Sequence, residues 1–411
     1  MPPVAVIGGG PAGLMAAEVL ATCDCTVTVV DHMRSPGRKF LVAGRGGLNL
    51  SHSEPLDDLL TRYTPPDPRL LRSIAAFPPS ALRAWCEGLG EETFVGSSGR
   101  VFPRSMRATP LLRAWLRRLD ELHVRFLTRH RFEGWDADGR LHVTSHADAT
   151  DVTDDAGDGL GAVDAVVLAL GGASWPGTGS NGGWTAALRE RGIAIAPLEP
   201  ANSGFLTSWT PRFAERFAGF PLKNVAVAFD GRSVRGELMV TELGLEGGPM
   251  YAHSNRLRMA TRSGSAARVT IDLRADLSID ALAIKLERPR GSQSTSTFLR
   301  KSAGLAPVAI GLLRECSPNG LPTDPGVLAA RIKAAPVDLL GPSPIVRAIS
   351  TAGGVAWDEI DDDFMLRHLP GVFVCGEMLD WEAPTGGYLL QASFSTAVAA
   401  AEGVLRRLAA R

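Results

Sequence analysis

The order of apolar and polar positions near the start of the chain predicts a strand, a helix and a second strand. Residues 4–7 form a short apolar run, residues 11–22 are rich in alanine and leucine, and residues 26–30 mix threonine with valine. Short β-branched runs on either side of a helical segment are typical of a βαβ unit. We therefore expect such a unit over residues 4–31.

A glycine-rich turn lies where the first strand meets the helix. Gly8, Gly10 and Gly13 are spaced as G-x-G-x-x-G, the arrangement of a dinucleotide-binding turn. Gly8 allows a sharp turn, Gly10 lets a pyrophosphate approach the backbone, and Gly13 lets the helix pack closely on the sheet. Pro11 and Ala12 open the helix, whose free N–H groups and positive dipole end attract phosphates. The alternative is a glycine-rich turn in an ordinary α/β protein.

An acid at the tip of the second strand narrows the choice of dinucleotide. Asp31 follows Gly13 by 18 residues, close to the spacing of an acid that binds a ribose. A carboxylate favours a free ribose 2′-hydroxyl over a 2′-phosphate. The pattern is consistent with FAD or NAD, and this unit alone does not choose between them.

Two later apolar runs also end in glycine. Residues 165–170 lead to Gly171 and Gly172, and residues 372–375 lead to Gly376 and Glu377. Short apolar runs of this kind are typical of buried parallel strands, and ligands bind at the carboxyl ends of such strands. We expect both ends of the chain to share one domain.

The α/β rhythm stops between these segments. Around residues 200–340, short strand-like runs alternate with glycine-rich turns and are followed by polar helical material. No second G-x-G-x-x-G follows a strand there, which argues against a separate nicotinamide-binding Rossmann domain. The predicted fold is α/β, a three-layer Rossmann-like domain formed by residues 1–198 and 345–411, with an inserted, mostly β and partly helical domain at 199–344.

Composition and charge restrict the partners. The 411 residues carry a formal net charge of −1, and nine arginines fall between Arg100 and Arg131. Several of these arginines lie opposite a leucine stripe, as on an ordinary solvated helix face, so nucleic acid is an unlikely partner. No apolar run approaches a membrane span, and the first strand leaves no room for a signal peptide. Five scattered cysteines suggest neither a metal site nor a dithiol, and we expect a cytoplasmic protein.

Two further segments carry a resemblance to a known family. Residues 37–49 read GRKFLVAGRGGLN, and residues 384–391 read PTGGYLLQ. With the N-terminal turn, they resemble the BaiN-like (YhiN-like) NAD(P)/FAD-dependent oxidoreductases of the glutathione-reductase-like flavoprotein superfamily, over nearly the whole chain. The chain has Gly47 and Leu48 where the family has Arg-Cys, so no role of that cysteine carries over. Arg45, which stands at a family glycine, is a candidate for the displaced positive charge.

The resemblance implies a non-covalent FAD, with NADH or NADPH as a possible transient reductant and a small organic molecule as acceptor. Members of the family are linked to reduction of carbon–carbon double bonds conjugated to a ketone. Together with the turn itself, it assigns the cofactor to Gly8, Gly10, Pro11, Ala12, Gly13, Asp31, His32, Arg38, Lys39, Gly44, Arg45, Gly46, Gly47, Asn49, Gly171, Gly172, Gly376, Glu377, Gly386, Gly387, Tyr388 and Leu389.

The catalytic acid or base is not evident from sequence. Tyr388, Glu382 and His52 flank the segments expected near the flavin, and each could donate a proton or be purely structural. Two other functions stay open: an RNA-modifying flavoprotein, suggested by the arginine-rich stretch, and a non-catalytic flavin redox sensor. The sequence does not indicate an oligomeric state.

Overall fold

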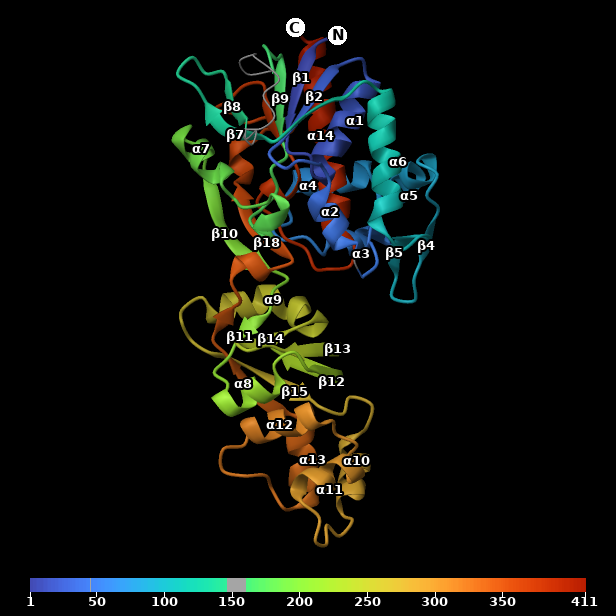
Figure 1. Cartoon of the computed structure of the whole chain (residues 1–411), viewed down its shortest axis with the longest axis vertical. Helices are drawn as coiled ribbons and strands as arrows, with labels where there is room; N and C mark the ends of the chain where they lie inside the picture. Colours follow the sequence, from blue (N-terminus) through green and yellow to red (C-terminus); the bar gives the residue numbers. More distant parts are fainter. Residues whose placement is uncertain (45, 146–159) are drawn as a thin grey trace, which may run out of the picture. The chain divides into compact units, whose positions relative to one another are not determined.

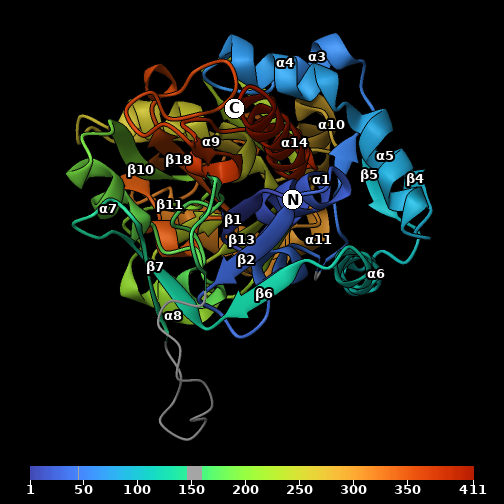
Figure 2. The same cartoon turned by 90° about the horizontal axis from the view of Figure 1, so that it is seen from above.

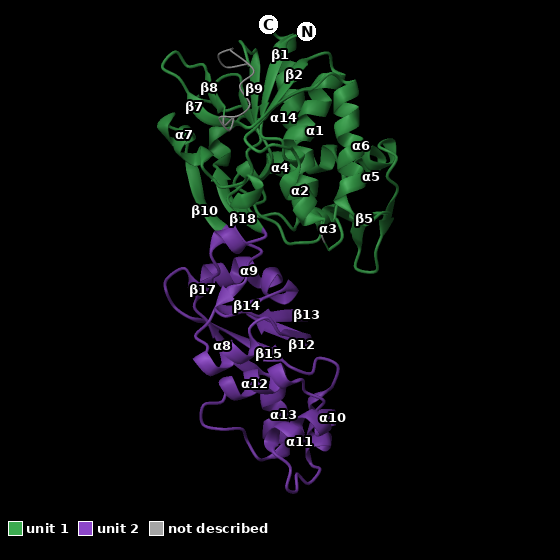
Figure 3. Ribbon diagram, viewed as in Figure 1, with its two compact units in different colours: residues 1–199, 350–411 green, residues 200–349 purple. Residues whose placement is uncertain are grey.

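The computed structural model describes residues 1–44, 46–145 and 160–411. The chain divides into two compact units (Figure 3): unit 1 is Met1–Glu199 with Ser350–Arg411, and unit 2 is Pro200–Ile349. Each unit has its own hydrophobic core. The sequence predicts the corresponding limits at residues 198 and 345.

Unit 1 is built on a parallel sheet to which both ends of the chain contribute (Figure 1). Its strands, in spatial order, are β19 (Val372–Val374), β9 (Ala165–Leu168), β1 (Pro3–Ile7), β2 (Thr26–Asp31) and β6 (Arg125–Thr128). Residues 4–7 and all of β9 and β19 are buried, as their continuous apolar runs predict for strands covered on both faces.

Helices from opposite ends of the chain cover one face of this sheet. Helix α1 (Pro11–Thr22) packs directly against α14 (Tyr388–Ala409), and small residues such as Ala16, Ala397 and Ala401 are fully buried in the same core. Small side chains let two helices approach closely. The other face is covered by β7 (His130–Trp135), β8 (Leu141–Ser145) and α7 (Trp184–Glu190) (Figures 1 and 2), which completes the predicted three layers.

The remaining elements of unit 1 form smaller groups around the sheet. A three-stranded antiparallel sheet consists of β3 (Ser51–His52), β5 (Arg100–Pro103) and β4 (Thr93–Val95), and β10 (Ile195–Ala201) pairs with β18 (Ser350–Val355). The helices are α2 (Arg38–Ala43), α3 (Leu56–Leu60), α4 (Pro68–Ala76), α5 (Pro79–Gly88) and α6 (Ala108–Glu121), with short 3₁₀ turns at Pro176–Thr178, Trp357–Glu359 and η4 (Gly376–Met378).

Unit 2 is an antiparallel sheet with helices, as the sequence predicts. The strands in spatial order are β16 (Ala335–Leu339), β15 (Ala267–Asp272), β12 (Pro221–Phe229), β13 (Arg232–Val240), β14 (Gly244–Glu246), β11 (Phe205–Leu206) and β17 (Gly341–Pro342). The helices are α8 (Pro211–Phe217), α9 (Gly248–Thr261), α10 (Ile279–Leu286), α11 (Thr295–Ser302), α12 (Pro307–Glu315) and α13 (Pro325–Lys333), with a 3₁₀ turn at Ile345–Arg347. In the part of the chain that the structure describes, no helix combines the length and apolar composition needed to cross a membrane.

Candidate functional site

The strand ends that the sequence singled out meet at one edge of the unit 1 sheet. Ile7 at the end of β1 is level with Val30 of β2 and with Leu168 of β9, and Leu168 is level with Val374 of β19. Because all these pairings are parallel, the segments that follow the strands emerge on the same side. The Gly8 turn, Asp31, Gly171 and Glu377 therefore belong to one edge.

The three glycines of the first turn differ in what surrounds them. Gly8 has φ +107°, and a Cβ there would collide with the Ala169 carbonyl; at Gly13 it would collide with the Gly8 carbonyl. Both positions are reserved for glycine by the protein's own packing. At Gly10 a Cβ would meet nothing within 4 Å, and φ is an ordinary −80°. The fold alone does not require glycine at position 10, whereas a group bound against the helix start does.

Asp31 holds the turn in place. One carboxylate oxygen accepts the Gly9 N–H at 2.8 Å, and the other accepts the Met33 N–H at 2.7 Å. Burial raises the pKa of Asp31 above its ordinary value, although both N–H groups and the nearby Arg38 work in the opposite direction. A carboxylate offers about four acceptor positions, so Asp31 retains capacity for a ribose hydroxyl. The hydrogen bond between Gly9 and Asp31 could not be predicted from the sequence.

Glu377 and Lys39, both predicted as cofactor residues, form an ion pair. Glu377 Oε2 lies 2.6 Å from Lys39 Nζ, and Lys39 also donates to the Ser174 hydroxyl at 2.8 Å. The other oxygen of Glu377 accepts the Thr351 N–H at 3.0 Å. The Lys39 ammonium offsets the charge of Glu377, so this acid can lie at an edge that would receive phosphates. Sequence reasoning did not identify the roles of Ser174 and Thr351.

Three further glycines of unit 1 pack closely against residues that are distant in sequence. A Cβ at Gly376 would lie 2.7 Å from the Ala12 side chain at the start of α1, and one at Gly387 would overlap the Ser51 carbonyl. At Gly172 it would overlap the Thr351 side chain. These close approaches join five segments that are far apart in sequence.

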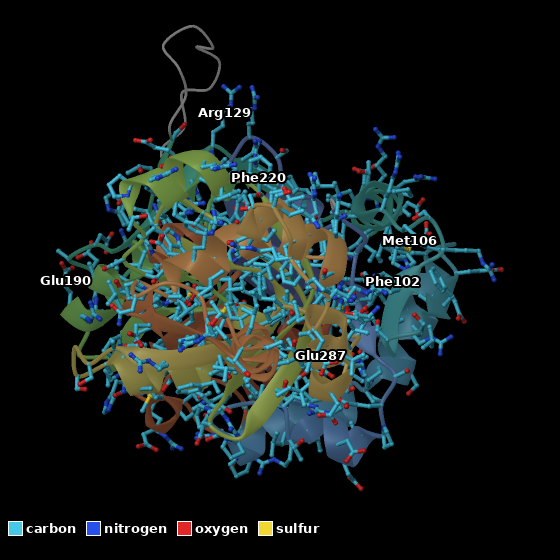
Figure 4. All side chains as sticks on the ribbon, turned by 90° about the horizontal axis from the view of Figure 1, so that it is seen from below. Phe102, Met106, Arg129, Glu190, Phe220 and Glu287 are labelled. Atoms are coloured by element: carbon cyan, nitrogen blue, oxygen red, sulfur yellow. The ribbon has the colours of Figure 1, made fainter. Side chains whose placement is uncertain are left out.

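Gly44 and Gly47 lie against the strand and loop that contain Phe102 and Met106, which are side by side in Figure 4. A Cβ at Gly47 would meet Met106 at 3.0 Å, one at Gly44 would meet Ala108 at 2.7 Å, and Gly46 is open. Arg45 lies outside the described residues.

Asn49 is half-buried, and its amide oxygen Oδ1 is fully buried. Its Nδ2 donates to the Gly47 carbonyl at 3.3 Å, whereas Oδ1 has no partner within the described residues. A buried acceptor without a donor costs free energy of about 1–3 kcal/mol. This atom is therefore a ready acceptor for an N–H group of a ligand.

The predicted proton donors Tyr388 and His52 lie together, at the start of α14. Their rings stack with centroids 5.3 Å apart. The Tyr388 hydroxyl donates to Glu54 Oε1 at 2.7 Å, and Arg62 binds the same carboxylate with contacts of 2.6 and 3.1 Å. Burial, with Glu54, raises the pKa of Tyr388 well above its ordinary value. Glu54 is a site residue that sequence reasoning missed, because no motif marks it.

His52 is also engaged within the protein. Its Nδ1 accepts the Glu54 N–H at 3.2 Å, and its Nε2 lies 3.1 Å from the Ser98 carbonyl. These partners make Nδ1 an acceptor and Nε2 a donor. Glu382, the third candidate, exchanges backbone hydrogen bonds with Thr64. Burial is the main cause that raises the pKa of Asp380 above its ordinary value, and the charge of Glu382 adds to it.

Three more of the predicted residues are His32, Gly386 and Leu389. A Cβ at Gly179 would meet the His32 ring at 3.0 Å, and one at Gly386 would lie 3.4 Å from Arg100. Leu389 is half-buried in the first turn of α14.

Comparison with known proteins identifies the family. Residues 2–403 match the HI0933-like protein Rossmann domain. The chain belongs to this family. The resemblance noted in the sequence is confirmed at that level, and so is the Rossmann-like fold with its antiparallel second part.

Two sequence relatives and one solved structure show what the HI0933-like chain is similar to. It is 26% identical to a 3-dehydro-bile acid delta(4,6)-reductase of Clostridium scindens, over 98% of this chain and 99% of that protein. It is 24% identical to a ribosomal RNA dihydrouridine synthase of Escherichia coli, over 97% of each. Among solved structures, 3-ketosteroid delta1-dehydrogenase of Sterolibacterium denitrificans aligns with a TM-score of 0.51 and 14% identity, over 99% of this chain and all of that one; this likeness concerns the fold.

The ion pair of Glu54 predicts a pH-dependent contribution to stability. Arg62 holds the pKa of Glu54 below its ordinary 4.5, against the effect of burial. A carboxyl group with a depressed folded-state pKa stabilises the protein above pH 4.5, and that stabilisation is lost as pH falls through the folded value. Since Arg62 is partly exposed, we expect Arg62→Met to lower the free energy of unfolding by up to about 1 kcal/mol near neutral pH, and by much less near pH 3.

Urea denaturation of both proteins at the two pH values measures this. Arg72→Met is the matched control, because its ion pair with Asp362 is largely exposed and should contribute little at either pH. An equal destabilisation by Arg62→Met at both pH values would contradict the assignment.

Proposed function

We propose that this HI0933-like protein is an FAD-dependent oxidoreductase that reduces a carbon–carbon double bond conjugated to a carbonyl group, with electrons from NADH or NADPH. The observation that carries the proposal is the turn at the start of α1, where Gly10 caps the helix and Asp31 binds the adjacent Gly9 N–H. A Cβ at Gly10 would meet no protein atom within 4 Å, so the protein itself leaves the space at this helix start open.

The residues at this edge fit FAD. The N–H groups at the start of α1 and the Gly10 backbone would hold the pyrophosphate, and Asp31 would accept a ribose hydroxyl. Asn49 Oδ1, buried and without a donor among the described residues, would accept an N–H of the isoalloxazine. The first turn of α14 would direct its unpaired N–H groups at an electron-rich ring edge.

The hydride chemistry itself comes from the flavin when it is bound. The chain's contribution is to bind, to orient and to retain protons. Tyr388 keeps its proton at neutral pH because burial and the Glu54 carboxylate raise its pKa, and the proton lies on the phenolic oxygen, directed at Glu54. The His52 ring stacks on the face of Tyr388.

The proposed class of electron acceptor is based on the names of two related proteins. The names of the bile acid reductase and of the dihydrouridine synthase both denote saturation of a carbon–carbon double bond. A small unsaturated ketone is our first choice, because the bile acid reductase is the more similar of these two. RNA is the second candidate, favoured by the dihydrouridine synthase. The five cysteines are all free thiols, which supports a reducing compartment, and we propose the cytoplasm.

Gly10→Ala tests the cofactor site. A Cβ at position 10 meets no protein atom within 4 Å, so the variant should fold and melt like the parent protein. The added methyl group would fill the space next to the pyrophosphate, and we expect FAD affinity to fall about tenfold or more, measured by fluorescence titration. The matched control is Gly248→Ala, which is equally open but lies in unit 2. Unchanged FAD affinity in Gly10→Ala would contradict the site.

The reaction is tested with the FAD-loaded protein under anaerobic conditions. NADH or NADPH should bleach the oxidised flavin absorbance, and a 4-ene-3-keto steroid should restore it, whereas the matching saturated 3-keto steroid should not. Restoration by a uridine-containing oligoribonucleotide alone would favour the RNA candidate. No bleaching by either nicotinamide would contradict the proposed reductant and favour a redox sensor.

A further inference from the structure

Unit 2 contains a cavity of about 410 Å³ that no part of the proposed redox chemistry uses. It lies among three helices, with α12 packed against both α8 and α11 (Figure 1). The lining residues are Thr210, Arg212, Phe213, Arg216, Phe217, Ser296, Thr297, Arg300, Pro307, Ile310, Gly311, Arg314 and Glu315. All of them belong to unit 2.

Each of the three helices turns basic side chains toward this cavity. Arg212 and Arg216 are four residues apart on α8, and Arg300 of α11 and Arg314 of α12 complete the group. Residues spaced by four on a helix share a face. All four arginines are exposed, and within the described residues none of them forms an ion pair with a carboxylate.

The one acid in the lining, Glu315, already accepts hydrogen bonds from Thr210. The two oxygens of Glu315 accept the Thr210 N–H at 2.5 Å and the Thr210 hydroxyl at 2.9 Å. Four arginines and one glutamate give the lining a formal charge of +3. Like charges held this close repel one another unless an anion joins them, so the lining is suited to a negatively charged ligand.

The floor of the cavity is apolar and aromatic. Phe213 and Phe217 are both buried, with ring centroids 5.3 Å apart. The Arg216 guanidinium lies 5.2 Å from the centre of the Phe217 ring. A Cβ at Gly311 would overlap that ring, so a glycine lets Phe217 occupy this position. An aromatic floor next to arginines accommodates a ligand that combines a flat ring with a phosphate.

The charge of unit 2 as a whole has the same sign. Residues 200–349 contain 19 Lys and Arg and 12 Asp and Glu, a net charge of +7, whereas the remaining residues contain 24 and 32, a net charge of −8. The overall charge of −1, which argued against nucleic acid in the sequence analysis, is thus the sum of two opposite and larger charges. Such asymmetry between parts of a chain is typical of proteins that bind a polyanion.

We propose that the unit 2 cavity binds a nucleotide, its phosphate held by Arg212, Arg300 and Arg314 and its base lying on the Phe213 and Phe217 floor. The charge excess extends beyond the cavity and favours a nucleotide within a single strand over a free one. The site is independent of the redox chemistry, so it stands or falls separately from the proposed function.

The test uses the full-length, FAD-loaded protein, so that FAD does not compete for the cavity. The probes are a fluorescein-labelled single-stranded oligoribonucleotide of about 12 nucleotides and ADP. In fluorescence anisotropy, Arg212→Ser/Arg300→Ser should weaken oligonucleotide binding by about tenfold or more. The dependence of log affinity on log salt should become shallower by about 0.7 for each phosphate that the variant no longer binds.

Arg232→Ser/Arg235→Ser is the matched control. It removes the same charge from exposed positions of β13, outside the cavity, and should have a much smaller effect. Melting temperatures of both variants report on folding, and Arg314→Ser gives an independent single substitution at the cavity. If ADP displaces the oligonucleotide at concentrations similar to that of the oligonucleotide, the ligand of the cavity is a free nucleotide. If the oligonucleotide binds and ADP does not displace it, the ligand is a nucleotide within a strand. Equally weakened binding in both double variants, or no binding of either probe, would overturn the proposal.

Discussion

The register of one parallel sheet determines everything else in unit 1. Because β9 pairs with both β1 and β19 in parallel, Ile7, Leu168 and Val374 end at the same level. The Gly8 turn and Glu377, which are almost a whole chain apart, are therefore neighbours at one sheet edge. A shift of one residue in β19 would turn its side chains to the opposite face and would move Glu377 away from Lys39.

The edge is held together by polar contacts between chain ends, in addition to the apolar core. The Lys39–Glu377 ion pair and the Tyr388–Glu54 hydrogen bond each join an N-terminal loop to the C-terminal segment. The ion pair is partly exposed, so its net contribution to stability is small, whereas the hydrogen bond involves the buried Tyr388. Their effect is on position: they fix a lysine, an acid and a helix start around the same space, which is the arrangement that a phosphate-containing cofactor requires.

Local pattern was sufficient for the elements and for the glycine turn. The spacing of Gly8, Gly10 and Gly13 is local, and residues 4–7 and 165–168 are apolar because both faces of the sheet are covered; these signals can be read directly. The packing that requires glycine at position 8 is not local, because the carbonyl that a Cβ would meet belongs to Ala169. The partners of Lys39 and Tyr388 could not be predicted, since they lie 338 and 334 residues away and no periodicity relates them. Glu54 and Thr351 belong to no recognisable motif, and their partners Tyr388 and Glu377 are also distant in sequence, so their roles could not be predicted. The opposite charges of the two units could not be predicted, because the net charge of the whole chain is the sum over both units, and only the structure shows where one unit ends and the other begins.

The central claim, that both ends of the chain form one FAD site, is tested most directly by amide hydrogen exchange of the full-length protein with and without FAD. We expect slower exchange on FAD addition in two segments together, residues 8–14 and residues 376–391, and no change in β12 and β13 of unit 2. Protection of only one of the two segments, or of neither, would contradict the account.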